Sequence, residues 1–235
     1  MKALRHLAAR ANTKLSELLY ERRFGVDTTG MVRPDFAADY DGSGADNNAY
    51  IAASWRQLQR WLPRRDVGPG DVFLDVGCGK GRVVFQAARL YPFRRVIGLE
   101  LDPQLAAVAR GNVERNAGRL RCKDVEVVET DASTWDVPDD VTVVFLYNPF
   151  SGEVFERFVG QLVASVQRRP RTVTIVYSYP REAAVLERTG QVRLLRQTEP
   201  PSSAVDRIRQ QLSSDHDYGV KVYALEPAPA AATRS

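Results

Sequence analysis

From about residue 71 onward, short apolar runs alternate with longer stretches in which apolar residues recur at helical spacing. The runs are nearly continuous in Val, Ile and Leu, which is typical of strands buried on both faces of a parallel sheet. The pattern predicts strands at 72–76, 94–100, 125–131, 141–149, 172–180, 192–197 and 218–225, and helices at 81–91, 103–116, 153–167 and 181–190. This alternation predicts an α/β fold with a doubly wound, mostly parallel seven-stranded sheet.

The first 65 residues follow a different pattern. Residues 1–19 place leucines on one helical face, which favours a packed amphipathic helix over a transit peptide or a membrane-surface helix. Residues 24–50 are rich in Gly, Asp and Asn and predict a loop, either a substrate lid or a spacer. We therefore divide the chain into three parts: a helical and loop extension, 1–65; an α/β domain, 66–226; and a flexible tail, 227–235.

Composition narrows the class of protein. The chain has 235 residues, of which 44% are hydrophobic and 26% charged, and no stretch reaches the roughly 18 to 20 unbroken apolar residues of a membrane span. Two cysteines are too few for a disulfide scaffold or a zinc site, which predicts a reducing, cytoplasmic location and no metal. The formal charge of +4 comes from basic residues interleaved with acidic ones, which argues only weakly for a nucleic-acid partner and does not exclude one.

The stretch FLDVGCGKGR, 73–82, predicts a nucleotide-type site. Gly77, Gly79 and Gly81 stand between a predicted strand and a predicted helix, where ligand and main chain can approach closely. The spacing is not the dinucleotide fingerprint, because that pattern needs glycine where this chain has Arg82, and the P-loop spacing is missing as well. These absences favour a ligand that contains adenosine without a phosphate chain.

Three carboxylates follow or end successive predicted strands, at the same edge of the sheet. Glu100 can accept hydrogen bonds from both hydroxyls of a ribose, as acidic residues at this spacing do in dinucleotide folds. Asp131 can accept from the amine of adenine, with the Ala132 backbone close by, and Asp75 can orient the loop or meet an ammonium group. Taken singly, each residue could instead serve packing or capping, but together they suit a cationic adenosine ligand.

At this point the chain resembles the class I S-adenosylmethionine-dependent methyltransferases. FLDVGCGKGR is similar to their first motif, VIGLELD to the acidic end of their second strand, and VVETDA to their third motif. The combination DTTG, GCGKGR, GLELD and FLYNPF also resembles a bacterial subgroup. The resemblance implies a Rossmann-like methyltransferase fold, S-adenosylmethionine as cofactor and S-adenosylhomocysteine as product. The cofactor-binding residues that follow from the motifs are Asp75, Gly77, Cys78, Gly79, Gly81, Glu100, Leu101, Asp131, Ala132 and Asn148.

FLYNPF, 145–150, closes the predicted fourth strand, which faces the methyl group in this fold. It is similar to the [DNS]-P-P-[YFW] motif of amino methyltransferases but lacks the second proline, so a planar base is not implied as substrate. We expect catalytic roles for Asn148, Tyr50 and His216, the last two as possible general bases, for which Tyr147, Tyr177 and Tyr179 are further candidates. We expect Tyr50, Pro149 and Phe150 to bind substrate, and residues 24–60 and 198–217 to enclose it.

The resulting functional hypothesis is methyl transfer to an oxygen or nitrogen nucleophile of a small molecule by in-line displacement. Alternatives are an RNA, DNA or protein acceptor, a different chemistry on the same cofactor, and a non-catalytic cofactor-binding subunit.

Overall fold

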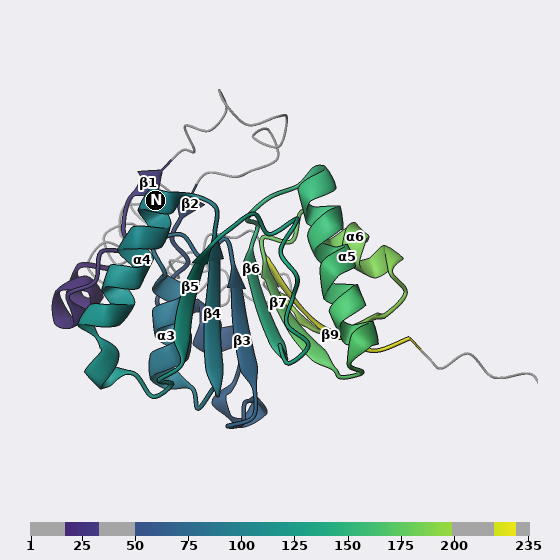
Figure 1. Ribbon diagram of the computed structural model, residues 1–235, viewed down its shortest axis with the longest axis horizontal. Helices are drawn as coiled ribbons and strands as arrows, with labels where there is room; N and C mark the ends of the chain where they lie inside the picture. Colours follow the sequence, from purple (N-terminus) through teal and green to yellow (C-terminus); the bar gives the residue numbers. More distant parts are fainter. Residues whose placement is uncertain (1–16, 33–49, 199–218, 229–235) are drawn as a thin grey trace, which may run out of the picture.

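The computed structural model describes residues 17–32, 50–198 and 219–228 and contains a twisted seven-stranded sheet (Figure 1). The strand order is β5-β4-β3-β6-β7-β9-β8. The strands are β3 (Val72–Val76), β4 (Arg95–Glu100), β5 (Val125–Glu129), β6 (Val143–Tyr147), β7 (Val173–Ser178), β8 (Val192–Gln197) and β9 (Val220–Leu225). Neighbours from β5 to β7 are parallel, whereas β9 runs antiparallel to both β7 and β8. The predicted doubly wound, mostly parallel sheet is confirmed.

Four helices connect the parallel strands and cover the sheet: α3 (Arg82–Leu90), α4 (Pro103–Arg115), α5 (Gly152–Arg168) and α6 (Ala183–Arg188). Figure 1 shows α3 and α4 together on one side and α5 and α6 on the other. Each predicted helix and strand of the domain lies within two residues of its observed bounds. Capping residues mark some of the helix boundaries in the sequence. Asp102 is an example, because its side chain accepts hydrogen bonds from the Gln104 and Leu105 amides at the start of α4.

Two apolar cores lie on the two faces of the sheet. All five residues of β3 are buried, and Phe73 belongs to the core beneath α3, whereas Leu74 belongs to the core beneath α5. Successive side chains of a strand point to opposite faces, so a strand covered on both faces is apolar at nearly every position. The continuous apolar runs in the sequence are the direct consequence.

The chain order places the topological switch point of the sheet between β3 and β6. β3 pairs with β4 on one side and with β6 on the other, so the connections leaving β3 and β6 diverge to opposite faces. Ligands of doubly wound sheets bind at such a switch point, outside the carboxyl ends of the strands. The glycine motif leaves β3 at this position.

The remaining described elements lie before the sheet in the chain. Residues 17–24 are helical, β1 (Met31–Val32) pairs antiparallel with β2 (Tyr50–Ile51), and α2 (Gln57–Trp61) precedes the short 3₁₀ helix η3 (Arg64–Asp66). A second 3₁₀ helix, η4 (Ala117–Arg119), follows α4. Most of the predicted N-terminal helix, and the tail from residue 229, lie outside the described residues. Within the described residues, no helix combines the length and apolarity needed to span a bilayer.

A buried arginine joins this N-terminal part to the sheet. Arg82, the first residue of α3, is only 2% exposed. Its guanidinium donates to the Thr28 hydroxyl at 2.8 Å and to the Ala53 carbonyl at 2.8 Å, and pairs with Glu17 at 3.3 Å. Glu21 lies 3.7 Å from the same guanidinium and also accepts from the Thr28 amide and hydroxyl. Arg82 therefore fixes residues 17–29 against the start of α3.

We expect Arg82→Met to destabilise the protein by about 3 kcal/mol, because removing one partner of a buried ion pair leaves the other charge without compensation. Urea unfolding measures the effect. Arg157→Met is the matched control, since within the described part of the chain the exposed Arg157 pairs only with Glu153 one turn away and should contribute less than about 0.5 kcal/mol. Equal losses in the two variants would contradict the structural role of Arg82.

Candidate active site

The turn between β3 and α3 is held in a conformation that only glycine adopts readily. Gly77 and Gly81 have φ of 70° and 77°, in the left-handed region. A Cβ on Gly77 would lie 2.6 Å from Cβ of Pro149, and one on Gly81 would lie 2.9 Å from Cβ of Ala109. The loop is therefore pressed between the end of β6 and α4, with no room for side chains at these two points.

Glu100, the last residue of β4, meets this loop directly. Its carboxylate accepts a hydrogen bond from the Gly79 amide at 2.7 Å and another from the Asp102 amide at 2.9 Å. The Cys78 amide donates to the Leu99 carbonyl at 2.7 Å, which ties the loop to β4 a second time. Burial raises the pKa of Glu100 despite these hydrogen bonds. The structure thus brings Cys78, Gly79 and Glu100 together, as the motifs predict.

Asp75 lies in β3 just before the loop and is 3% exposed. Its Oδ2 has no hydrogen-bond partner among the described residues. Burial, and next the nearby charge of Glu100, raise the pKa of Asp75 to about 8, while a hydrogen bond from the Val84 backbone acts in the opposite direction. A ligand that brings a positive charge and a hydrogen-bond donor would satisfy this carboxyl. The site therefore fits the ammonium group of S-adenosylmethionine, which the sequence motifs predict.

Asp131 and Ala132 lie at the same edge, just beyond β5. The Thr130 amide donates to the Glu100 carbonyl at 2.9 Å, so the ends of β4 and β5 are adjacent. The Asp131 carboxylate accepts from the Ser133 amide at 2.8 Å, which orders the turn and occupies one of its two oxygens. Ala132 is buried next to it, whereas Leu101, after Glu100, is half-buried. Contact of these residues with the cofactor stays a prediction.

The segment after β6 places Asn148 and Pro149 beside the glycine loop. Asn148 is buried and has φ of 43°, an uncommon conformation for a residue other than glycine. Phe150 is only 5% exposed, and its ring centroid lies 6.0 Å from those of Phe155 and Phe158 in the core beneath α5. The Phe150 ring is thus largely occupied by core packing, and its predicted contact with substrate is untested.

The structure describes the two candidate general bases, Tyr50 and His216, only in part. Tyr50 belongs to β2, of which the structure describes the backbone. His216 lies outside the described residues, as does most of the predicted enclosing segment 198–217. That segment leaves from the end of β8 and returns at the start of β9, and Val220 pairs with Ser178 at the carboxyl end of β7. Its connections are therefore at the edge of the sheet where the glycine loop lies. No group of side chains suited to a metal occurs among the described residues.

Sequence reasoning missed the residues that support the loop from outside. Lys80 donates to the Asp27 carboxylate at 2.9 Å and to the Thr29 carbonyl at 2.8 Å. The buried Asn112 of α4 donates to the carbonyls of Asp27 and Lys80, at 2.7 Å and 2.9 Å. The sequence signal for these contacts was the joint presence of DTTG (27–30) and GKGR (79–82). The structure shows that Lys80 of the second motif bonds directly to residues of the first.

The comparisons with known proteins agree with this geometry. Residues 73–169 match a family whose description is "Methyltransferase domain". The chain contains a class I S-adenosylmethionine-dependent methyltransferase domain. The family, fold and cofactor predicted from the motifs are thereby confirmed, with S-adenosylmethionine as the cofactor of this domain.

Individual relatives share only part of the chain. A protein-lysine N-methyltransferase of Saccharolobus islandicus is 29% identical over 101 residues, which cover 42% of this chain and 61% of that protein. Nocamycin O-methyltransferase of Saccharothrix syringae is 37% identical over 92 residues, covering 38% and 31%. The chain thus spans less than two thirds of these curated relatives. The solved structure of precorrin 8w decarboxylase from Methanobacterium thermoautotrophicum has a TM-score of 0.52 at 18% identity, covering 75% of this chain and 92% of that one, and shows a shared fold.

We expect Gly77→Ala to weaken the binding of S-adenosylhomocysteine at least tenfold. The added Cβ would collide with Pro149 and force a residue with a side chain into the left-handed region, so the loop must move. Isothermal titration calorimetry measures the affinity. Gly118→Ala is the control, because a Cβ there would meet nothing within 4 Å. An affinity unchanged in both variants would show that the close approach of the loop is not required.

The raised pKa of Asp75 predicts a pH-dependent stability. In the folded protein the proton stays bound up to about pH 8, whereas in the unfolded chain it leaves near pH 4, so Asp75 lowers the unfolding free energy as pH rises between these values. One proton contributes a slope of at most roughly 1.4 kcal/mol per pH unit. Asp75→Asn removes this titration, so the stability of the variant should improve relative to wild type from pH 5 to pH 8. Parallel stability curves would contradict the shift.

Proposed function

We propose that this chain transfers a methyl group from S-adenosylmethionine to an oxygen or nitrogen nucleophile of a small molecule. The observation that carries the proposal is the buried Asp75 carboxyl, with an oxygen lacking a partner among the described residues, directly before a glycine loop that Glu100 also contacts. A buried and a half-buried acidic group beside bare main chain favour a ligand that is both cationic and closely packed against the backbone.

Each acidic residue has a separate task in this proposal. Asp75 accepts a hydrogen bond from the ammonium group of the methionine moiety, and the positive charge of that group favours the ionised form of the Asp75 carboxyl. Glu100 holds the Gly79 amide and accepts from the ribose hydroxyls, while Asp131, with one carboxylate oxygen bound to the Ser133 amide, uses the other for the adenine amine. When bound, the cofactor supplies a methyl group on a positively charged sulfur, which is reactive toward a nucleophile without a metal.

The acceptor would approach from the end of β6. In-line displacement depends chiefly on placing the nucleophile about 3 Å from the methyl carbon and on excluding water. Asn148 is suited to hold an acceptor, because it is buried and its backbone is fixed beside Pro149, which packs on Gly77. Tyr50 or His216 would take the proton where the acceptor is a hydroxyl or a protonated amine. Tyr177 is less suitable as a base, since burial raises its pKa to about 12.

A protein amine is the second candidate acceptor. The relative from Saccharolobus islandicus is named for the methylation of protein lysine, and it is 29% identical to this chain over 101 residues. An RNA acceptor, a different reaction of the cofactor and a purely cofactor-binding role are the further outcomes that an assay must separate. Formation of S-adenosylhomocysteine in the presence of small nucleophiles, peptides or RNA, with mass spectrometry of the acceptor, distinguishes all of these.

We expect Glu100→Gln to lower the affinity for S-adenosylhomocysteine at least tenfold, about 1.4 kcal/mol, because an amide can accept from only one of its two terminal atoms. Calorimetry at pH 7.5 measures this, with Glu126→Gln on the exposed face of β5 as the control. An affinity unaltered by Glu100→Gln would remove Glu100 from the ribose role. Retained affinity in wild type without turnover of any acceptor would favour the non-catalytic alternative.

A further inference from the structure

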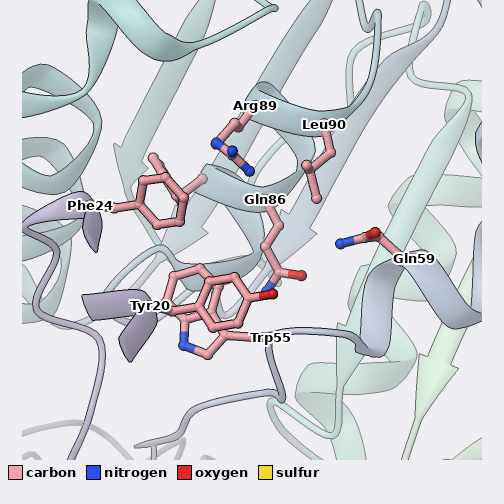
Figure 2. Close-up of a pocket in the computed structure, with 8 residues that line it drawn as sticks. Tyr20, Phe24, Trp55, Gln59, Gln86, Arg89 and Leu90 are labelled. Atoms are coloured by element: carbon pink, nitrogen blue, oxygen red, sulfur yellow. The ribbon is translucent and has the colours of Figure 1, made fainter. Parts of the chain in front are cut away.

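A second cavity lies on the outer side of α3, away from the glycine loop (Figure 2). It has a volume of about 190 Å³ and is walled by the helix at 17–24, the segment 55–59 and the second half of α3. We call it the α3 pocket. Gln86 and Leu90 lie four and eight residues beyond Arg82, about 6 and 12 Å along the helix axis. None of the predicted cofactor-binding residues lines the pocket.

Four of the eight residues that line the pocket are aromatic. Tyr20 stacks on Trp55 with ring centroids 5.0 Å apart, and Phe24 lies 5.4 Å from Phe85. Trp55 and Phe85 meet edge to face at 6.1 Å, which joins the two pairs. An apolar cavity of about 150 Å³ accommodates benzene, so the α3 pocket has room for one aromatic ring and a few more atoms.

Two polar atoms in this wall lack partners among the described residues. Gln86 is 2% exposed, and its Oε1 accepts no hydrogen bond there, although its Nε2 donates to the Ser54 carbonyl at 3.5 Å. The Nε1 of the buried Trp55 likewise has no acceptor. Figure 2 shows the Gln86 side chain extending from α3 toward Tyr20 and Trp55. Buried polar groups are normally paired, so the Gln86 oxygen needs a donor that the described residues do not supply.

Arg89 adds a positive charge at the rim. Its guanidinium carbon lies 4.4 Å from the ring centroid of Phe24 and forms no ion pair with the described residues. Burial lowers the pKa of Arg89, and the neighbouring charge of Arg23 lowers it further, followed by Arg64 and Arg119. This arrangement leaves a cluster of like charges that an anion would neutralise, and arginine binds a carboxylate through two parallel hydrogen bonds.

We propose that the α3 pocket binds a monocyclic aromatic carboxylate, at a site separate from the cofactor crevice. The ring packs among Trp55, Phe24 and Phe85, and the carboxylate pairs with Arg89. A polar substituent on the ring bonds to Gln86. The ring accounts for the aromatic walls and the volume, and the carboxylate accounts for the arginine without an acidic partner.

Calorimetry of the full chain with benzoate tests this, in the absence and in the presence of saturating S-adenosylhomocysteine. Benzoate should bind in both cases, and at least ten times more tightly than benzyl alcohol or cyclohexanecarboxylate. Arg89→Gln should lower the affinity for benzoate at least tenfold and leave the affinity for benzyl alcohol unchanged. Arg89→Lys should lower the affinity for benzoate by a smaller factor. Arg94→Gln is the matched control, because Arg94 is exposed and pairs with Asp140 elsewhere on the surface.

Absence of benzoate binding to wild type would overturn the proposal. So would equal binding of benzoate and benzyl alcohol, displacement of benzoate by S-adenosylhomocysteine, or unchanged benzoate affinity in Arg89→Gln. The comparison among the three probes uses only wild-type protein, so it holds even where a variant folds poorly. Because the readout is benzoate binding, it is independent of the proposed methyl transfer, which fails instead when S-adenosylhomocysteine does not bind.

Discussion

The close packing of the glycine loop against its neighbours is the constraint on which the site depends. Gly77 meets Pro149 after β6, Gly81 meets Ala109 of α4, and the Gly79 amide is bonded to Glu100 at the end of β4. Three elements that are far apart in the chain thus converge on five residues. Because the loop cannot move independently of them, its main chain, Asp75 and Glu100 keep fixed relative positions, which is what tight binding of a small cofactor requires.

The same packing creates the electrostatic asymmetry of the crevice. The buried Asp75 and the half-buried Glu100 lie close enough for the charge of Glu100 to raise the pKa of Asp75, and no basic side chain among the described residues pairs with either. Arg82 directly follows the glycine loop, but its guanidinium contacts Glu17, Glu21 and the Thr28 hydroxyl instead of these two carboxyl groups. The negative charge is therefore left for a cationic ligand, in keeping with the methyltransferase family.

The fold was predictable because each strand carries its own signal. Continuous apolar runs such as 143–147 specify burial on both faces, and local caps such as Asp102 fix the helix starts. The glycine loop was predictable for a similar reason, since spacing within one short motif determines its position after β3, whereas the contacts of its residues with the cofactor stay predictions. Arg82 was readable only as a departure from a dinucleotide motif, because its partners Ala53, Thr28 and Glu17 lie between 29 and 65 residues earlier in the chain. Phe150 was likewise predicted to bind substrate because it belongs to the motif FLYNPF. Its burial depends on Phe155 and Phe158 of the following helix, which the motif does not include.

The side chain of Arg82, the first residue of α3, connects the glycine loop to the α3 pocket. The guanidinium of Arg82 lies 5.1 Å from the ring centroid of Trp55, and that same ring forms a wall of the α3 pocket. Arg82 directly follows Gly81, the last glycine of the cofactor loop. A ligand that orders Trp55 therefore also orders Arg82, the residue at which α3 begins. A second connection runs through residues 53–55: the Ser54 carbonyl accepts from Gln86, and the neighbouring Ala53 carbonyl accepts from Arg82. The N-terminal part of the chain is thus a structural support of the cofactor loop as well as one wall of the second pocket.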